Sequence, residues 1–438
     1  MKILIANRGE IAVRIIKTCQ EMGIHTVAIH STADAKAMHV RIADEAICIG
    51  PPAIEESYLN MMAILSAADV TGVDAIHPGT GLLSENYKFA RAVVDCGFIF
   101  IGPNYQSIAK MSNKIEAKKV ASKYGLNPIT SFAANISCDT YPVIVKSECG
   151  GGGRAMFVAN NKIELTTAIQ KSQLEASTQY GTKNVYLEEF VHQPLHIEVQ
   201  ILADMHGNVL HFYDRECSIQ RRNQKIIEES GCNFIDTILK KNLFDSVKNM
   251  IRAIKYVGLG TCEFLYKNGK FHFMEMNTRL QIEHTVTEMW TGIDLVREQI
   301  LVAMGDKLTL QQDDICHHGH VIECRINTEN PQNLTPSFGH ITEYHAPCGN
   351  GVRIDSDMYR GTYISPYYDN MIAKVIVKDR DRLTCIHKMM RALKEYVIEG
   401  VQTNIPLLQR ILQHSDFVNY EHHTQWLQNH IDNKWQNN

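Results

Sequence analysis

The chain has 438 residues, a formal net charge of −4, 45% hydrophobic residues and 21% charged residues. The length predicts roughly two to four domains, and the composition is typical of a globular rather than a disordered chain. The small net charge argues against a general attraction to nucleic acid or to an anionic membrane.

The twelve cysteines and the apolar stretches bear on the cellular compartment. The cysteines form no C-x-x-C pair and no usual zinc spacing, which favours reduced thiols over the alternative of a secreted disulfide framework. The apolar run at the start stops at Arg8, too short for a signal sequence, and no stretch approaches the roughly 20 apolar residues of a membrane span. We therefore expect a cytoplasmic protein that binds neither membrane nor nucleic acid.

Strand-like and helix-like segments alternate over the first hundred residues. Strands are predicted at Lys2–Ala6, His25–His30, Ala46–Ile49, Ala75–His77 and Phe98–Ile101, with helices at 11–23, Tyr58–Ala68 and Glu85–Cys96. This β-α-β alternation predicts a doubly wound parallel-sheet domain over residues 1–112. The turn after the first strand is N-R-G-E, so a dinucleotide site of the G-x-G-x-x-G type is disfavoured.

Two further regions follow, over residues 113–316 and 317–438. The second region opens with a helical stretch that contains Lys114, and its predicted strands are Tyr141–Lys146, Ala155–Ala159, Val185–Val191, Ile197–Ala203 and Leu210–Asp214, with a hairpin at Asn268-Gly269. The third region has a predicted strand at His320–Asn327 and helices at Arg382–Glu395 and Ile405–Gln413. The fold class is therefore α/β and α+β, with a C-terminal part of mostly antiparallel strands and helices.

The most informative segment runs from Met274 to Glu283. With a strand period of two, the side chains of one face are all polar: Glu275, Asn277, Arg279, Gln281 and Glu283. A half-buried edge strand would show the same alternation. The preceding predicted strand, 261–266, favours a site instead because it carries Glu263 next to this segment.

The hairpin register decides whether Glu263 and Glu275 meet. A two-residue turn would put them on opposite faces, whereas a three-residue loop would keep them on one face, so we predict the three-residue loop. Two carboxylates about 4 Å apart repel by about 4 kcal/mol at an effective dielectric of about 20, so a cation must compensate. With the carbonyl of Asn277 they form an oxygen-only set that suits Mg²⁺. Arg279 offers a fork for a small planar oxyanion, and Glu283 a general base.

Two more segments suggest phosphate or anion binding. Four consecutive glycines, Gly150–Gly153, separate two predicted strands, so their backbone N–H groups can close over phosphates while Lys146 and Lys114 supply positive charge. A flexible hairpin would look the same, and the loop lacks the G-K-[ST] of a Walker motif. The basic cluster 220–225 is either a solvated surface or a contact for anionic substrates in a cleft.

Isolated polar residues on two other predicted strands admit two interpretations each. Glu323, Arg325 and Asn327 share one face, and a structural salt bridge explains Arg325 as well as a functional role does. His196 and Glu198 also share a face. A lone histidine there is more often structural, and zinc is disfavoured because no second histidine or cysteine lies at ligand spacing.

Taken together, these segments resemble biotin carboxylase, the ATP-grasp component of acetyl-CoA carboxylase and related biotin-dependent enzymes. The match runs nearly end to end and includes I-A-N-R-G-E-I-A near the start, H-P-G-T-G-L-L-S-E-N at His77–Asn86, the glycine run, C-S-I-Q-R-R-N-Q-K, E-M-N-T-R-L-Q-I-E-H and E-C-R-I-N. The resemblance implies an N-terminal biotin carboxylase domain at 1–112, an ATP-grasp domain with a glycine-rich lid at 113–316, and a C-terminal biotin carboxylase domain at 317–438.

The resemblance also implies a role for each matching position. ATP would be bound by Lys114, Lys146, Gly152, Gly153, Glu188, Glu189, Phe190, Val191, His196, Gln220, Asn223, Glu263 and Glu275. Glu263, Glu275 and Asn277 would hold Mg²⁺ or Mn²⁺, while Lys225, Arg279, Gln281 and the backbone of Ile282 would bind bicarbonate. Glu283 would deprotonate bicarbonate, which attacks ATP to give carboxyphosphate. The phosphate released would take the proton of biotin N1, and Arg325 would stabilise the enolate-like biotin oxygen.

Several positions depart from the family pattern, and other functions stay open. Asn223 replaces a usual histidine, Cys149 and Ala155 replace glycines, Thr80 a tyrosine, Glu189 a lysine and Thr285 a proline. These departures motivate the alternative of a catalytically weak, regulatory relative. A different ATP-grasp ligase of the carbamoyl-phosphate or purine-pathway type is less favoured, since it would not require Lys225 and Arg325 together with R-L-Q-I-E-H.

The resemblance further implies partners. We find no M-K-M acceptor motif in an apolar β-rich setting, so we expect biotin to arrive on a separate biotin carboxyl carrier protein. A carboxyltransferase would then pass the carboxyl group to acetyl-CoA, another acyl-CoA or pyruvate. At the family's usual dimer surface Arg353 and Glu21 match while Lys17 and Asn350 differ, and we expect a homodimer.

Overall fold

The N-terminal part is a five-stranded parallel sheet with helices on both faces. A computed structural model describes residues 1–133, 141–148, 156–180 and 182–433. The strand order is β3-β2-β1-β4-β5, and every neighbouring pair is parallel. The elements are β1 (Lys2–Ile5), α1 (Gly9–Glu21), β2 (His25–Ser31), α2 (Met38–Ile42), β3 (Glu45–Gly50), α3 (Met61–Thr71), β4 (Ala75–His77), α4 (Tyr87–Asp95), β5 (Ile99–Phe100) and α5 (Tyr105–Ser112).

Alternation along β1 explains the two covered faces. Ile3 and Ile5 pack with apolar residues of α1, whereas Leu4 packs on the other face with residues of α3 and α4. Successive strand residues point to opposite faces, so a continuous apolar run is what a sheet buried on both sides requires. The predicted doubly wound parallel sheet is confirmed.

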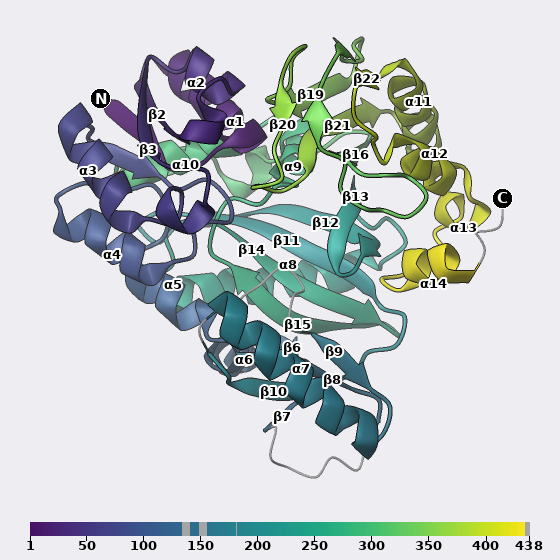
Figure 1. Cartoon of the computed structure of the whole chain (residues 1–438). Helices are drawn as coiled ribbons and strands as arrows, with labels where there is room; N and C mark the ends of the chain where they lie inside the picture. The colour runs from purple at the N-terminus through teal and green to yellow at the C-terminus, as the bar shows by residue number, and fades with distance from the viewer. Residues whose placement is uncertain (134–140, 149–155, 181, 434–438) are drawn as a thin grey trace.

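A nine-stranded sheet forms the centre of the molecule (Figure 1). Its order is β19-β21-β16-β13-β12-β11-β14-β15-β6, and all neighbours are antiparallel except β15 and β6. The strands are β6 (Asn127–Pro128), β11 (Leu195–Ala203), β12 (Val209–Arg221), β13 (Gln224–Ser230), β14 (Gly258–Lys267), β15 (Lys270–Asn277), β16 (His320–Asn327), β19 (Val352–Ser356) and β21 (Met371–Asp379). The sheet thus takes strands from both the second and the third predicted region.

Helices lie around this sheet. They are α6 (Lys114–Lys123), α8 (Thr237–Ala253), α9 (His284–Thr291), α10 (Leu295–Ala303), α11 (Arg382–Glu395), α12 (Ile405–Gln413), α13 (Ser415–Val418) and α14 (Trp426–Asn433). Two small ribbons, β17 (Gly339–His340) with β20 (Tyr363–Ile364) and β18 (Glu343–His345) with β22 (Val397–Glu399), complete the C-terminal part. Within the described ranges, no helix is long and apolar enough to cross a membrane, and all ten cysteines are free.

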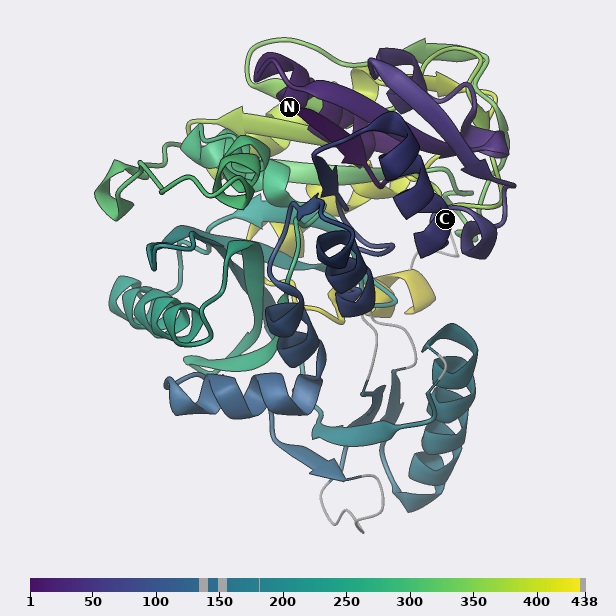
Figure 2. The ribbon, with the colours of Figure 1, turned by 90° about the vertical axis from the view of Figure 1, so that its left-hand side faces the viewer.

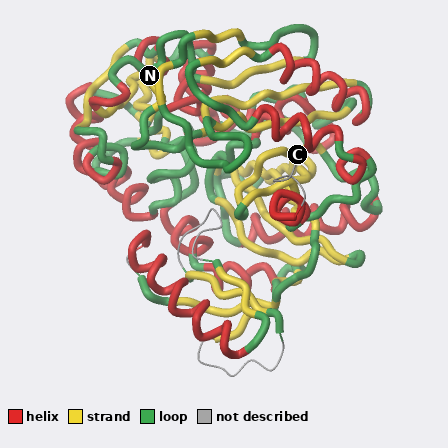
Figure 3. Tube along the Cα trace, turned by 45° about the vertical axis from the view of Figure 1, so that its right-hand side comes forward, coloured by secondary structure: helices red, strands yellow, loops and turns green. Residues whose placement is uncertain are grey.

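A separate lobe carries the second, smaller sheet (Figure 2). Its order is β7-β10-β8-β9, all antiparallel, with β7 (Ser131–Ala133), β8 (Val143–Ser147), β9 (Phe157–Ala159) and β10 (Val185–Glu189). The long helix α7 (Lys162–Tyr180) lies along this sheet (Figure 3). Val143, Val145 and Leu187 build the lobe's own core with Leu165 and Ala168 of α7. The glycine run lies outside the described residues.

The hairpin between β14 and β15 corrects one prediction. Lys267 pairs with Lys270, so the loop is the two residues Asn268 and Gly269, both with positive φ (50° and 74°), and not a three-residue loop. Positive φ at both central positions is the type I′ turn favoured by Asn-Gly. The register then shifts between the Phe264–Phe273 pair and the Glu263–Glu275 pair, so Met274 is the extra residue of a β-bulge.

The predicted strand through Glu283 is also wrong. β15 ends at Asn277, and Glu283 is the N-cap residue of α9. The chain leaves the sheet because the amide of Thr278 donates to the Glu85 carboxylate (2.9 Å) and not to a neighbouring strand. The shared polar face from Glu275 to Glu283 therefore holds only as far as Asn277.

The basic cluster 220–225 is the tip of a second hairpin. β12 continues to Arg221, and β13, which periodicity did not predict, starts at Gln224. Arg222 and Asn223 form the turn, again with positive φ (49° and 63°). Both turn residues are exposed, whereas Lys225 returns into the sheet.

Candidate active site

One row of charged side chains crosses adjacent strands of the central sheet. Glu275 pairs with Glu263, Glu263 with Glu198, and Glu198 with Arg215, which places these residues on β15, β14, β11 and β12 in turn. Glu198, Glu263 and Arg215 are buried. Buried charges are stable only when paired, so this row must be neutralised by its neighbours or by a ligand.

The two glutamates of the β14–β15 hairpin differ in their partners. The Glu263 carboxylate is held by His196 Nε2 (3.2 Å), by Lys225 Nζ (3.0 Å) and by the Asn277 amide Nδ2 (2.8 Å). Glu275 lies 3.2 Å from Lys114 Nζ and is partly exposed. Burial raises the pKa of Glu263, but Lys225 and His196 outweigh it and hold that pKa well below its ordinary value. The donor set fits Mg²⁺, since both carboxylates lie side by side and one remains accessible.

Lys225 is the positive centre of the site. Its Nζ lies 2.5 Å from Glu198, 2.6 Å from Glu283 and 3.0 Å from Glu263. Burial lowers the pKa of Lys225, yet the three carboxylates raise it well above its ordinary value. Lys225 therefore remains charged, and an incoming anion meets an ammonium group already fixed in position.

Arg325 and Glu283 face each other at the other end of the site. Arg325 NH2 lies 3.1 Å from Glu283 Oε2, and its Nε donates to Glu228 Oε1 (2.6 Å). Burial raises the pKa of Glu283, but Lys225 and Arg325 outweigh it and keep that pKa below its ordinary value. For Glu228 burial dominates and raises the pKa despite Arg325. Glu283 is therefore the carboxylate that stays ionised and able to accept a proton.

Arg279 links the site to the N-terminal domain. Its Nε donates to Glu85 Oε2 (2.8 Å), and its NH2 donates to the Asn277 Oδ1 (2.9 Å), while NH1 lies 3.3 Å from the Thr80 hydroxyl. In this arrangement the amide oxygen of Asn277 faces Arg279 and its Nδ2 faces Glu263. The guanidinium is thus held in one plane beside Glu283 and Lys225.

Gln281, Ile282 and His196 are each held by a buried neighbour. Gln281 bridges Arg215 NH2 (2.6 Å) and Glu263 Oε1 (2.8 Å). The carbonyl of Ile282 accepts from Lys374 Nζ (2.7 Å). His196 Nδ1 lies 2.9 Å from Gln220 Nε2, which brings two of the predicted nucleotide-binding residues together.

Glu188 forms a separate charge cluster in the small lobe. Its carboxylate contacts Lys118 and lies 2.6 Å from Lys146 Nζ, and the Tyr186 hydroxyl donates to it (2.8 Å). Burial opposes ionisation, but the two lysines hold the pKa of Glu188 at about 2. β10 ends one residue later at Glu189, which is exposed, and Phe190 and Val191 follow outside the strand. The predicted contacts of Gly152 and Gly153 lie outside the described residues.

Five functional neighbours were missed by sequence reasoning: Glu85, Lys118, Glu198, Arg215 and Glu228. Glu198 carried a signal, since it shares a strand face with His196. Arg215 is fully buried and donates to Glu198, Gln200, Thr287 and Gln281. Its strand was predicted to stop at Asp214, since charged residues usually face solvent. An arginine in the middle of an otherwise apolar strand would have indicated a buried ion-pair network.

Comparison with known proteins identifies the class. Three family models match consecutive parts of the chain: "Biotin carboxylase, N-terminal domain" over residues 1–108, "Carbamoyl-phosphate synthase L chain, ATP binding domain" over 105–311, and "Biotin carboxylase C-terminal domain" over 323–429. Together with the antiparallel sheets and the carboxylate pair, these matches define an ATP-grasp ligase.

Similar proteins narrow the class to a family. Biotin carboxylase 1 of Bacillus subtilis is 47% identical over 98% of both chains, and a pyruvate carboxylase subunit of Methanothermobacter thermautotrophicus is 45% identical over 97% of this chain and 89% of its own. The biotin carboxylase domain dimer of Hydrogenobacter thermophilus 2-oxoglutarate carboxylase, solved with MgADP, ADP and bicarbonate, is 40% identical and covers 98% of this chain and 97% of its own, with a TM-score of 0.95. The chain belongs to the biotin carboxylase family.

Proposed function

We propose that this biotin carboxylase carboxylates biotin on a separate carrier protein as part of an acetyl-CoA carboxylase, the enzyme that makes malonyl-CoA for fatty acid synthesis. The observation that carries the reaction is the convergence of Lys225 and Arg325 on Glu283. The Bacillus relative supports the biotin carboxylase activity. The relative named for pyruvate carboxylase makes the carboxyl acceptor the open part of the proposal.

Bicarbonate would bind between Lys225 and Arg279, with Gln281 and the Ile282 backbone completing the contact. Both cations are fixed by ion pairs, so little ordering is needed when the anion arrives. Glu283, ionised and 2.6 Å from Lys225, would take the bicarbonate proton. The solved relative with bound bicarbonate supports this part of the proposal.

Glu263, Glu275 and Asn277 would hold Mg²⁺ or Mn²⁺. When bound, the ion neutralises negative charge on the nucleotide phosphates. Glu275 and Lys114 would contact the same nucleotide, together with Lys146, His196, Gln220, Asn223 and the segment from Glu188 to Val191. Burial of the Glu188 carboxylate between two lysines assigns its side chain a structural part, so nucleotide contacts from this segment would come from its backbone and from Glu189 onward.

Arg325 would stabilise the oxygen of biotin as negative charge develops there. Its guanidinium carries a fixed charge, because Glu228 and Glu283 raise its pKa against the effect of burial. A preorganised donor of this kind acts mainly on the transition state.

The cellular and quaternary context belongs to the same proposal. We propose a cytoplasmic homodimer that works with a biotin carboxyl carrier protein and carboxyltransferase subunits, and three domains at 1–112, 113–316 and 317–438. The dimeric relative supports the assembly.

Reconstitution tests the acceptor. The chain is incubated with MgATP, labelled bicarbonate and biotinylated carrier, and then with carboxyltransferases specific for acetyl-CoA, propionyl-CoA or pyruvate. The proposal predicts labelled malonyl-CoA in the first reaction above the other two. Equal labelling of the carrier followed by transfer only to pyruvate or propionyl-CoA would move the chain to another carboxylase. Absence of carrier labelling despite MgATP binding would favour a regulatory relative.

A further inference from the structure

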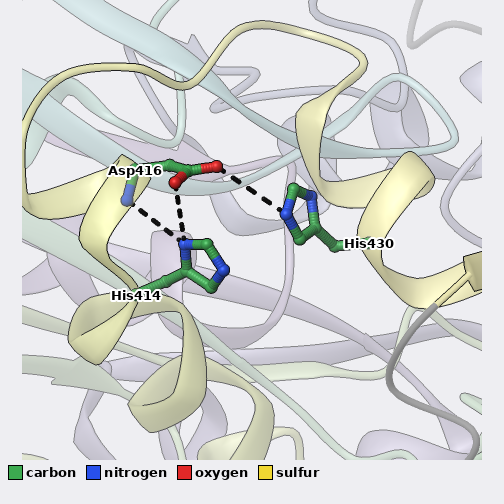
Figure 4. A group of neighbouring side chains, drawn as sticks. All are labelled: His414, Asp416 and His430. Carbon is green, nitrogen blue, oxygen red and sulfur yellow. Dashed lines mark hydrogen bonds and ion pairs between the residues drawn. The ribbon is translucent and has the colours of Figure 1, made fainter.

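Two histidines and an aspartate meet near the C-terminus, far in sequence from the active site (Figure 4). His414 follows α12, Asp416 lies in α13, and His430 lies in α14. Each offers one ligand atom, and these three atoms lie within 4.8 Å of one another. All three residues are half-buried, so an ion can reach them from solvent.

The hydrogen bonds around the cluster fix where the imidazole lone pairs point. His430 Nδ1 lies 2.8 Å from the Trp426 carbonyl oxygen, which only accepts, so Nδ1 carries the proton and the lone pair of the neutral ring is on Nε2. That atom faces Asp416 Oδ2 at 3.7 Å. His414 Nδ1 accepts the backbone N–H of Asp416 (3.2 Å), so its lone pair also lies on the side of the carboxylate, 3.4 Å from Oδ1.

Three electron-rich atoms thus converge on one point when both rings are neutral. Such an arrangement is repulsive unless a cation lies among the atoms. The surrounding contacts are those that orient metal ligands: a histidine whose other ring nitrogen donates to a backbone carbonyl, and a carboxylate that accepts a hydrogen bond, here from Trp426 Nε1 (2.8 Å).

The spacing suits a tetrahedral ion. Zinc binds nitrogen and oxygen at about 2.0–2.2 Å, which separates neighbouring ligand atoms of a tetrahedron by about 3.4 Å. The two nitrogen–oxygen distances, 3.4 and 3.7 Å, match this edge within a small side-chain adjustment. Two imidazole nitrogens exclude Mg²⁺ and Ca²⁺ as the preferred ions, since both favour all-oxygen ligands.

The other three groups of this kind among the described residues do not suit a separate ion. Two of them, His196–Glu198–Glu263 and Glu198–Cys217–Glu283, share residues with the active site. The third, Glu216–Glu229–His422, is buried, and Arg382 already neutralises Glu229 at 2.7 Å.

We propose that His414, Asp416 and His430 bind one Zn²⁺-class divalent metal ion, with water in the fourth position. The ion ties α14 to the end of α12 and to α13. The loop before α14 donates from the Thr424 amide to the Pro194 carbonyl (3.0 Å), and Gln425 accepts from the Gln193 amide (3.1 Å). The bound ion therefore stabilises the segment that leads into β11, beside residues 188–191.

Metal titration of the full chain tests the site. The protein is treated with chelator, desalted, and titrated with Zn²⁺ in excess Mg²⁺, which keeps oxygen-ligand sites occupied. His414→Gln, His430→Gln and Asp416→Asn each remove one ligand, and Asp416→Asn retains an acceptor for Trp426. His387→Gln is the matched control, because His387 is an exposed histidine on the neighbouring helix α11.

We expect one Zn²⁺ per chain in the wild type and the control, and loss of that equivalent in all three variants. Co²⁺ should give the intense visible absorption of a tetrahedral site in the wild type alone among the wild type and the ligand variants. Zn²⁺ should raise the Tm of the wild type and the control but not of the variants. Absence of the equivalent in the wild type, or its retention in the three variants, overturns the proposal. If one variant fails to fold, the Co²⁺ spectrum of the wild type and the other two variants still decide.

Discussion

Glu263 and Glu275 lie opposite each other on β14 and β15, and the β-bulge at Met274 brings them together rather than the length of the turn. Without the extra residue, the two-residue Asn268-Gly269 turn would place the two carboxylates on opposite faces of the sheet. The bulge therefore creates the carboxylate pair from a turn whose register would otherwise separate it.

Glu275→Gln should weaken the metal requirement of the site without harming the fold. Glu275 is partly exposed, and its ion pair with Lys114 is likewise within reach of solvent. We expect the Mg²⁺ concentration for half-maximal ATP hydrolysis to rise by about 10- to 100-fold. Glu116→Gln, which removes an exposed carboxylate next to Lys119, is the control and should leave the curve unchanged. Equal curves for Glu275→Gln and the wild type would refute a metal role for Glu275.

Glu283→Gln should abolish the bicarbonate-dependent part of ATP hydrolysis. Loss of a general base costs about 100- to 10,000-fold in turnover, whereas MgATP affinity should hardly change because Glu283 contacts Lys225 and Arg325. Steady-state rates with and without bicarbonate and equilibrium MgATP binding give the two readouts. The matched control Glu329→Gln alters an equally buried glutamate paired with Arg221. Retained bicarbonate-dependent turnover in Glu283→Gln would rule out its role as base.

Arg325→Ala should lose biotin-dependent turnover by about 100- to 1,000-fold while nucleotide affinity is retained. The variant also leaves the buried Glu228 without its partner, which destabilises the fold. Arg221→Ala is the matched control, since both arginines are 13% exposed and pair with a buried glutamate. Turnover is compared below the Tm of both variants. Collapse of MgATP binding in Arg325→Ala would mean that the roles of the nucleotide and biotin sites are not separate.

Lys118→Met should destabilise the small lobe in a pH-dependent way. Burial raises the pKa of Glu188, but Lys146 and Lys118 outweigh it and lower that pKa from 4.5 to about 2. A lowered pKa contributes stability above pH 4.5 that is lost as the pH falls through about 2, and the full shift corresponds to about 3 kcal/mol. The difference in free energy of unfolding between wild type and Lys118→Met should therefore be largest near about pH 7 and smaller near about pH 3.5.

Denaturant unfolding at several pH values measures this difference. Lys119→Met is the control, because Lys119 is 64% exposed and its pair with Glu116 should be worth at most about 1 kcal/mol. A destabilisation by Lys118→Met that does not change with pH would show that packing, and not the charge of Glu188, accounts for the effect.

Much of the architecture follows from apolar periodicity. β4, β16, α11 and α12 have the predicted bounds, because their apolar and polar residues alternate with a clear period and their ends carry turn residues. β13 was missed because Glu228, Glu229 and Ser230 read as a solvated run, yet all three are buried. Periodicity assumes that charged residues face water, and that assumption fails where a sheet face is an active site.

The site could be predicted in its residue types but not in its pairing. The motifs indicated Glu263, Glu275, Arg279 and Glu283, whereas the bulge at Met274 and the end of β15 at Asn277 depend on tertiary contacts such as Glu85 with Thr278. Arg215 and Glu198, which hold Gln281 and Lys225 in position, are distant in sequence from those motifs. Only the assembled sheet shows that they belong to the same site.

Bicarbonate-dependent ATP hydrolysis, measured with and without free biotin, tests the central claim most directly. The account predicts that MgATP and bicarbonate support a slow hydrolysis that biotin stimulates, because Arg325 and Glu283 then act on both substrates. A chain that binds MgATP but shows no stimulation by biotin would contradict the assignment of the site to biotin carboxylation.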